Sequence, residues 1–313
     1  MTCFLLPAMH RLHFSQVPQG AVPQLLPPPS LPPPKPQLFW WNLLLAFLHT
    51  LSLSLIACFT TNPWTVYLTM PRSLWVPLDG NSTASCSDVP CRIETGAVTI
   101  GSANIEWMVI AFHAPAVMSH LYACWTNTAY TEQLIALQAT GHRWLEYSVS
   151  ASIMTACIAL LSNITDVWLI TCACVMCAVT QLTGYLSEAN VRSNASGVLT
   201  KRWTFFGAGV VLILPIWVNI YYNYHYALAN QESDPPWWVG MVIYSLLVLF
   251  TCFAVVHALY LKDRMKPDEV PQPLVTAEYR YMFLSLTSKT MLAWSIWYGA
   301  LGREAREVQA YHP

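Results

Sequence analysis

One lysine lies where a charged side chain is costly, near the middle of the apolar run 279–301. No other basic residue stands within eight positions of Lys289 on either side. A bare ammonium at the centre of a bilayer costs roughly 2.5 kcal/mol or more, so this amine must be neutralised or used. It can deprotonate, pair with a buried carboxylate, or form a Schiff base with a carbonyl ligand. Only the last of these makes Lys289 itself a functional group.

A carboxylate that could face Lys289 is present in the apolar segment 138–162. Glu146 is the candidate counterion, and Ser150 follows it by four residues, on the same face of a helix. A hydroxyl there could donate a hydrogen bond to the group that holds the negative charge. Ser285 precedes Lys289 by one helical turn and shares its face. The alternative is a structural salt bridge between Lys289 and Glu146, because pairing is the usual state of charges inside membranes.

The elements that must hold these residues are membrane spans. Of the 313 residues, 55% are hydrophobic and only 10% are charged, and the mean hydropathy is +0.41. Such a composition indicates an integral membrane protein, in contact with membrane lipid. A net charge of −1 provides no broad basic field, which argues against nucleic acid as a partner. We expect no metal site, because Cys172, Cys174 and Cys177 share one apolar segment without a histidine.

Seven segments are long enough, at about 20 residues each, to cross roughly 30 Å of hydrocarbon. They are 38–60, 104–126, 138–162, 165–187, 203–227, 237–261 and 277–301. Only a tight turn at 162–166 separates the third segment from the fourth. The sequence therefore predicts an all-α bundle of seven transmembrane helices.

The distribution of basic residues predicts the orientation of this bundle. With the N-terminus inside, ten lysines and arginines lie on the inner side and four on the outer side. The inner ones are Arg11, Lys35, Arg143, Arg192, Lys201, Arg202, Lys262, Arg264, Lys266 and Arg280; the outer ones are Arg72, Arg92, Arg303 and Arg306. This excess predicts a cytoplasmic N-terminus and an extracellular C-terminus.

Three regions follow from this pattern. Residues 1–37 are proline-rich and predict a disordered or polyproline II cytoplasmic tail, with a transit peptide as the weaker alternative. Residues 38–301 form the transmembrane domain. Residues 302–313 are expected to be a short extracellular tail.

The first extracellular loop, 61–103, carries two features that belong outside the cell. Asn81 begins an Asn-Ser-Thr glycosylation sequon. Cys86 and Cys91, five residues apart, suit a short disulfide, with two free thiols as the alternative.

Two strings, RWLEYSVSASIM around Glu146 and SLTSKTMLAW around Lys289, resemble the signatures of heliorhodopsins, a family of seven-helix retinal proteins. The resemblance covers about 38–301 and implies a rhodopsin-like fold. Heliorhodopsins have the N-terminus in the cytoplasm, an orientation that the basic residues predict independently. By this resemblance Lys289 would carry all-trans retinal as a Schiff base and Glu146 would be its single counterion. Ser150 and Ser285 would be hydrogen-bonding companions.

The resemblance also implies a polar cavity near the Schiff base. His49 and His120 match the family histidines that line it, with His113 as a rival for His120. Trp294 resembles a tryptophan near the chromophore. The alternatives are a backbone-bonded histidine for His49, an interfacial histidine for His120 and a lipid-facing residue for Trp294.

Two positions depart from the family pattern. The chain has Thr140 where an asparagine is expected six residues before the counterion, and Ser52 where a glutamine is expected three residues after the first histidine. We therefore expect the polar cavity to be arranged differently, which leaves photocycle rates and ion leakage open.

Carboxylates typical of proton pumps are replaced in this chain. Light-driven pumps resemble one another in an aspartate four residues before the retinal lysine and a second carboxylate about eleven residues beyond the counterion; Ser285 and Cys157 stand there. A vectorial pump needs a proton acceptor and a donor on opposite sides of the Schiff base. We therefore expect isomerisation without net pumping.

A retinal pocket needs aromatic walls. The fifth and sixth segments supply five candidates: Trp217, Tyr221, Tyr244, Phe250 and Phe253. Ordinary packing is the alternative for most of them.

The combined prediction is a light-absorbing photoreceptor with a slow photocycle, not an enzyme. It would signal to an unknown cytoplasmic partner through the loop 261–277, and the resemblance implies a homodimer. The alternative is a light-gated proton or cation channel. A lysine-dependent membrane enzyme or a G-protein-coupled receptor is less favoured, because there is no metal-binding group and the orientation is reversed.

Overall fold

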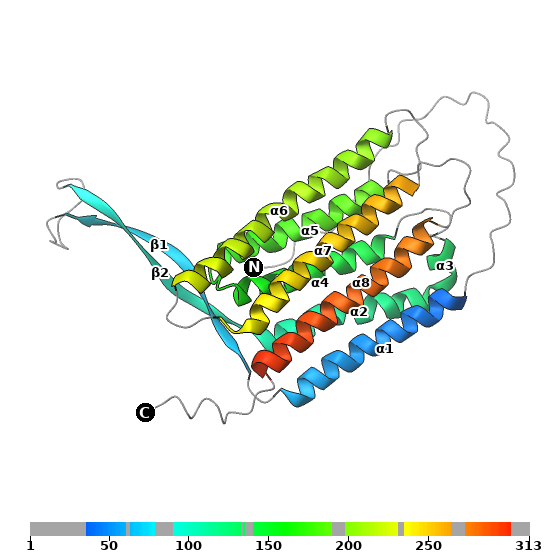
Figure 1. Cartoon of the computed structure of the whole chain (residues 1–313), viewed down its shortest axis with the longest axis horizontal. Coiled ribbons are helices and arrows are strands. Elements are labelled where there is room, and N and C mark those ends of the chain that lie inside the picture. Colours follow the sequence, from blue (N-terminus) through cyan, green and yellow to red (C-terminus); the bar gives the residue numbers. More distant parts are fainter. Residues whose placement is uncertain are drawn as a thin grey trace, which may run out of the picture. The chain divides into compact units, whose positions relative to one another are not determined.

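The computed structural model describes residues 36–60, 63–78, 90–132, 134, 140–189, 198–230, 235–263 and 273–301. Within these ranges, seven long helices run side by side (Figure 1). They are α1 (Pro36–Phe59), α2 (Ile105–Trp125), α4 (Gly141–Leu161), α5 (Val167–Ala189), α6 (Val198–Asn230), α7 (Trp237–Asp263) and α8 (Pro273–Ile296). A short helix, α3 (Asn127–Glu132), follows α2, and a π-helical turn, Trp297–Leu301, ends α8.

Each of the seven segments expected from the sequence is one of these helices. Six of them, all except α8, are long and apolar enough to cross a membrane, counted over the described residues. The last helix is less apolar because its middle carries hydroxyl side chains and one charge. These residues are Ser285, Thr287, Ser288, Lys289 and Thr290. The helix with the weakest hydrophobic signal is therefore the one that carries the candidate functional lysine.

Local sequence explains the tight connection between α4 and α5. Asn163 adopts a left-handed backbone (φ 64°), a conformation that asparagine tolerates better than most residues. The amide of Ile164 donates back to the carbonyl of Ala159 at 3.0 Å, which closes the end of α4. Asp166 Oδ1 then accepts from the amides of Trp168 (2.7 Å) and Leu169 (3.2 Å) and caps the start of α5.

Strands β1 (Thr65–Pro77) and β2 (Cys91–Asn104) form an antiparallel hairpin in a region that the sequence analysis treated as a loop. A two-stranded hairpin is marginally stable alone, and this one is anchored by the amide of Thr69, which donates to the carbonyl of Thr165 at 2.9 Å. Asn81 and Cys86 lie outside the described residues. Glycosylation at Asn81 and a disulfide between Cys86 and Cys91 therefore stay predictions.

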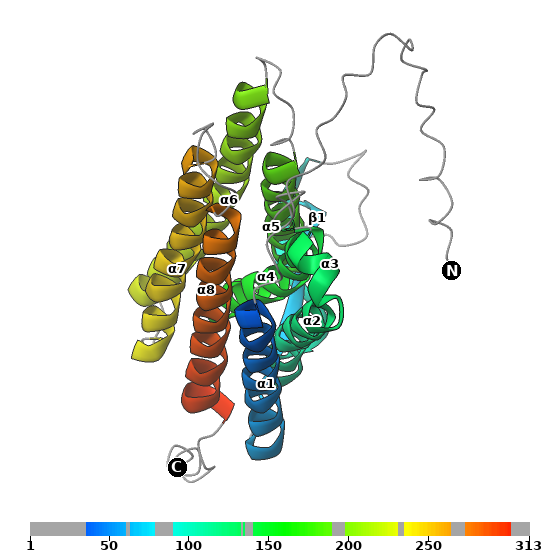
Figure 2. The ribbon, with the colours of Figure 1, turned by 90° about the vertical axis from the view of Figure 1, so that its right-hand side faces the viewer.

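Helix α4 is the central element of the bundle. It packs against α2, α5 and α7, while α1 contacts α2 and α8, and α8 contacts α7 (Figure 2). Within its most apolar stretch 67% of the residues are buried, against 17 to 33% in the other five helices that meet the same criteria. A polar residue that faces inward from α4 is therefore removed from lipid and must find its partner inside the protein.

Close packing between α4 and α5 gives a first test. The indole of Trp144 lies against Gly184, so a Cβ at position 184 would overlap the ring. We expect Gly184→Ala to destabilise the protein by about 1–3 kcal/mol through overpacking. Gly207→Ala on α6 is the matched control, because a Cβ there meets no atom within 4 Å. Thermal unfolding in detergent should separate the two variants; equal midpoints would contradict this packing.

Candidate functional site

Lys289 and Glu146 meet inside the bundle. Lys289 Nζ lies 2.9 Å from Glu146 Oε1 and donates a 2.6 Å hydrogen bond to Ser285 Oγ. Lys289 is 2% exposed and Glu146 is 7% exposed, so the two charges are compensated by each other and not by water. The Tyr147 ring lies 5.3 Å from Lys289 Nζ, a cation–π contact that the sequence did not suggest.

Helical spacing explains how these side chains converge. Ser285 and Lys289 are four residues apart on α8, so the hydroxyl lies directly beneath the amine. Glu146 and Ser150 share the buried face of α4 in the same way. The hydroxyl of Ser150 has no hydrogen-bond partner among the described residues, so the predicted bond from Ser150 is not formed here.

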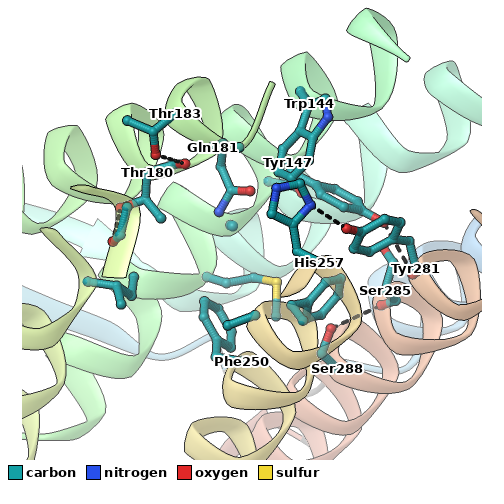
Figure 3. A pocket seen from close by; sticks show the side chains of 18 of the residues that line it. Trp144, Tyr147, Thr180, Gln181, Thr183, Phe250, His257, Tyr281, Ser285 and Ser288 are labelled. Atoms are coloured by element: carbon teal, nitrogen blue, oxygen red, sulfur yellow. Dashed lines mark hydrogen bonds between the residues drawn. The ribbon is translucent and has the colours of Figure 1, made fainter. Parts of the chain in front are cut away.

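A cavity lies beside the Lys289 amine. Its empty space is about 850 Å³, a figure that includes space open to the outside. Side chains of five helices, α4 to α8, line it, and Figure 3 shows Ser285 and Ser288 on one side and Thr180, Gln181 and Thr183 on the other. The aromatic lining residues are Trp144, Tyr147, Phe206, Phe250, Phe253 and Tyr281.

Of the aromatic residues expected to line the pocket, only Phe250 and Phe253 do so. Trp217 is buried behind Phe250, with ring centroids 5.3 Å apart, and Tyr221 and Tyr244 are exposed. These three expectations are wrong because composition locates a ring on a helix but not on a particular face. A spacing of three positions along the helix, as from Phe250 to Phe253, is the periodic signal that could have selected the inner face.

The three histidines expected near the site form one group. His49 Nδ1 lies 3.0 Å from His113 Nδ1, and the ring of His49 stacks on that of His120 at 5.7 Å between centroids. His120 Nδ1 lies 2.8 Å from Asn42 Oδ1. His113 is therefore not a rival of His120 but a third member, and Asn42 is a partner that sequence reasoning missed.

Three further expected residues lie at defined positions. Trp294 Nε1 on α8 donates to Ser52 Oγ on α1 at 3.4 Å, and the Trp294 side chain is half-buried. Ser52, which stands where the family pattern has a glutamine, thus contacts the Trp294 indole. Thr140 is fully buried at the start of α4, and its hydroxyl has no partner among the described residues.

This arrangement suits a covalently held, elongated apolar ligand with a carbonyl end. A primary amine stands at the wall of an aromatic cavity, a carboxylate can balance a positive charge on its nitrogen, and a hydroxyl contacts the same nitrogen. A Schiff base of retinal needs each of these groups. The residues present therefore fit retinal.

Seven helices, with a lysine on the last one paired to a carboxylate on the third long helix, define a rhodopsin-like membrane protein. A model of the heliorhodopsin family matches residues 38–301, and the chain belongs to that family. Comparison with curated proteins gives no match.

Solved structures support the fold. The light-driven proton pump LR (Mac) from Leptosphaeria maculans is similar with a TM-score of 0.57 and 10% identity, over 85% of this chain and 96% of that one. The transmembrane domain of Salpingoeca rosetta rhodopsin phosphodiesterase follows at 0.55 and 10%, over 83% of each chain. The light-driven proton pump Coccomyxa subellipsoidea rhodopsin CsR has 0.54 and 13%, over 83% of this chain and 95% of that one. At such identities the likeness shows the fold alone.

Family membership has direct consequences. The chain is a multi-pass integral membrane protein of a retinal-binding photoreceptor family, and it has the inverted topology with the N-terminus in the cytoplasm. This agrees with the orientation that the basic residues predicted. Microbial rhodopsins are generally not enzymes.

Proposed function

We propose that this protein is a photosensory receptor in which Lys289 binds all-trans retinal as a Schiff base and Glu146 is the single counterion. The observation that carries the proposal is the Lys289–Glu146 ion pair at the wall of an aromatic cavity. A purely structural salt bridge explains the pair but gives no reason for the cavity beside the amine.

Bound retinal would supply absorption of visible light and a change of shape on isomerisation. Glu146 holds the negative charge that keeps the Lys289 nitrogen cationic, and Ser285 fixes the position of that nitrogen by its hydrogen bond. Both side chains of the ion pair are buried, and burial strengthens the attraction between their charges.

The histidine group is the proposed acceptor of a proton released from the Lys289 nitrogen. His49 and His113 share a single hydrogen between their Nδ1 atoms, so the ring that donates it presents a bare Nε2. Neither Nε2 has a partner among the described residues. Uptake at this nitrogen keeps the proton inside the protein and prolongs the photointermediate, and slow decay suits a sensor.

Reconstitution tests the proposal directly. Purified protein mixed with all-trans retinal is expected to develop a visible absorption band that hydroxylamine bleaches, because hydroxylamine attacks the imine carbon. Retinal in the same buffer without protein is the blank. No band, or a band that resists hydroxylamine in the light, would refute a Schiff base.

Illumination is expected to produce no sustained pH change in a suspension of intact cells that contain the protein. The two positions where pumps carry additional carboxylates hold Ser285, which is bonded to Lys289, and the buried Cys157. Because neither position holds a carboxylate, the chain lacks the pair of groups by which such pumps accept a proton on one side of the nitrogen and return one from the other. A sustained, uncoupler-sensitive pH change would overturn this part of the proposal, and a photocurrent under voltage clamp would favour the light-gated channel instead.

Two further elements complete the proposal. The protein is a sensor and not an enzyme, and it passes its conformational change to a cytoplasmic partner through the cytoplasmic loops, especially 261–277. The family resemblance adds that it acts as a homodimer. Residues 264–272 of that loop lie outside the described residues.

A further inference from the structure

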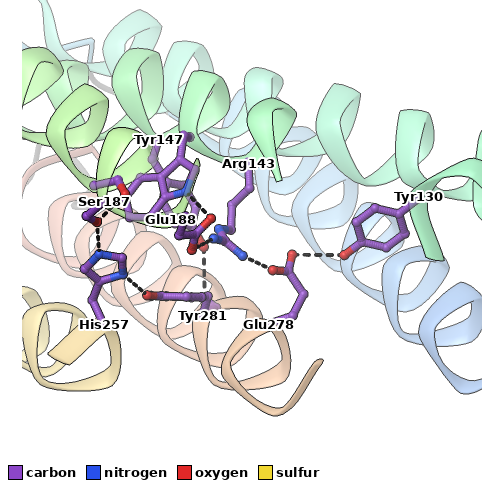
Figure 4. A network of polar contacts seen from close by, with 10 residues as sticks. Tyr130, Arg143, Tyr147, Ser187, Glu188, His257, Glu278 and Tyr281 are labelled. Atoms are coloured by element: carbon purple, nitrogen blue, oxygen red, sulfur yellow. Dashed lines mark hydrogen bonds and ion pairs between the residues drawn. The ribbon is translucent and has the colours of Figure 1, made fainter. Parts of the chain in front are cut away.

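A second buried charge cluster lies at the end of the bundle that carries α3 (Figure 4). Arg143 on α4 forms ion pairs with Glu188 on α5 and Glu278 on α8. All three are buried, at 4%, 0% and 2% exposure. Arg143, one of the basic residues counted for the inner side, is not solvated: its guanidinium lies 4.3 Å from the centroid of the Tyr281 ring, inside the protein.

The cluster contains one permanent cation and two carboxyl groups. If both carboxyls were ionised, the site would carry a net charge of −1 without contact to water. An uncompensated buried charge costs several kcal/mol, and proteins usually avoid it by changing protonation. One proton is therefore required, and hydrogen-bond partners decide which group can hold it.

A protonated Glu188 would find no acceptor for its hydrogen among the partners observed. Its Oε1 accepts from Arg143 Nη2 and its Oε2 accepts from Trp144 Nε1 at 2.7 Å. Both partners are N–H groups that donate and have no lone pair to accept. A hydrogen on either oxygen would have no acceptor among these partners, whereas the ionised carboxylate uses both donors, so we assign the ionised state to Glu188.

Glu278 differs at one oxygen. Its Oε2 accepts from Arg143 Nη1, but its Oε1 lies 2.9 Å from the hydroxyl of Tyr130. A phenol both donates and accepts, so it can receive a hydrogen from a protonated Glu278. Burial raises the pKa of Tyr130, so this phenol keeps its own hydrogen, and Asn42 is a further hydrogen-bond partner for it.

The hydrogen bonds of the histidines that face the cluster do not require a second positive charge. Ser187 Oγ donates to the carbonyl of Gly184, so it must accept from His257 Nε2 at 2.5 Å. His257 Nδ1 lies 2.7 Å from Tyr281 Oη, a phenol that can donate to it, so a neutral His257 ring satisfies both contacts. His142 contacts Tyr130 only through its ring, at 5.1 Å between centroids, and is the rival location for a positive charge.

We propose that Glu278 is protonated in the resting protein and is a proton-holding site separate from the Lys289–Glu146 pair. Tyr130 and Asn42 connect it to His120, since Asn42 Oδ1 lies 2.8 Å from His120 Nδ1. The cluster thereby shares hydrogen-bond partners with the histidine group.

Infrared spectroscopy at neutral pH tests the assignment. The protein is expected to show a carbonyl stretch of an undissociated carboxylic acid that Glu278→Gln removes and Glu94→Gln on the exposed hairpin leaves intact. Tyr130→Phe keeps the acid but removes its phenol partner, so the band should shift to higher frequency. Because Lys289 takes no part in the cluster, the band is expected with and without retinal, and a colourless protein would leave this result unchanged.

A stability comparison provides a second readout. Glu278→Gln replaces one neutral group by another and is expected to leave the unfolding midpoint close to that of the unmodified protein. Glu188→Gln removes the ionised partner of Arg143 and is expected to lower the midpoint clearly or abolish folding. Equal losses in the two variants, or absence of the acid band, would overturn the proposal. A band that appears only in His142→Gln protein would place the compensating charge on His142 and overturn it as well.

Discussion

Lys289→Ala protein is expected to remain colourless when all-trans retinal is added, whereas the unmodified protein turns coloured. The visible band requires a cationic imine at the Lys289 nitrogen, and alanine has no amine to form one. The lining offers no substitute for this amine, because Lys289 is the only lysine at the cavity among the residues that the structure describes. The measurement is an absorption spectrum of purified protein after addition of retinal, with Lys262→Ala at the exposed end of α7 as the matched control.

Loss of colour must be separated from loss of fold. Removal of Lys289 leaves the Glu146 carboxylate buried without a partner, which costs about 3–5 kcal/mol when one member of a buried pair is deleted. The double variant Lys289→Ala with Glu146→Gln removes both charges and should fold more readily. Lys289→Arg keeps a cation beside Glu146 but offers no primary amine. All three variants are expected to be colourless, and a retinal band in folded Lys289→Arg protein would disprove the attachment.

The sequence predicted the helices and the central ion pair because both depend on strong local signals. A lysine in an apolar segment must be neutralised, and Glu146 was the carboxylate at a suitable depth in another span. Helical spacing then placed Ser285 beside Lys289, as the structure has it. These inferences needed only the length of a span and the period of a helix.

The second cluster was missed because a charged residue near the end of a membrane helix can lie either in solvent or inside the protein. Arg143, Glu188 and Glu278 each lie within about two turns of the end of a segment, where a solvated residue is the usual expectation. Only the long-range packing of α4 against α5 and α8 brings them together. Their burial depends on the rotation of each helix about its axis, which weakly amphipathic spans do not specify in sequence. The same uncertainty explains the wrong choice of Tyr221 and Tyr244.

The hairpin was missed for a different reason. Most side chains of β2 are exposed, so the strand lacks the apolar alternation by which half-buried strands are recognised. Its register, Thr65 opposite Asn104 and Pro77 opposite Cys91, is set by pairing between segments and not by either segment alone. Extended β-branched stretches between two membrane helices were the only available signal.

Glu146→Gln is expected to move the absorption maximum of the retinal-bound protein strongly to longer wavelength. In the ground state the positive charge is concentrated near the Lys289 nitrogen, where Glu146 Oε1 stabilises it from 2.9 Å. Excitation moves this charge away from the nitrogen, so the carboxylate stabilises the ground state more than the excited state. Glutamine has a similar shape without the charge, so the energy gap between the ground state and the excited state narrows. Spectra of the variant and of Glu94→Gln, which changes an exposed carboxylate on β2, measure the effect.

The pH at which the spectra are recorded decides how the shift is interpreted. Without Glu146 the cationic imine nitrogen is buried without a compensating charge. A larger fraction of the variant molecules should therefore lose the proton from this nitrogen and absorb in the near ultraviolet. Acidification is then expected to restore a visible band, and that band should lie to the red of the unmodified protein. Ser285 remains as a hydrogen-bond partner but carries no charge and cannot replace the carboxylate. A spectrum identical to that of the unmodified protein across this titration would exclude Glu146 as counterion, because no neutral residue at 2.9 Å from a cation reproduces the field of an anion.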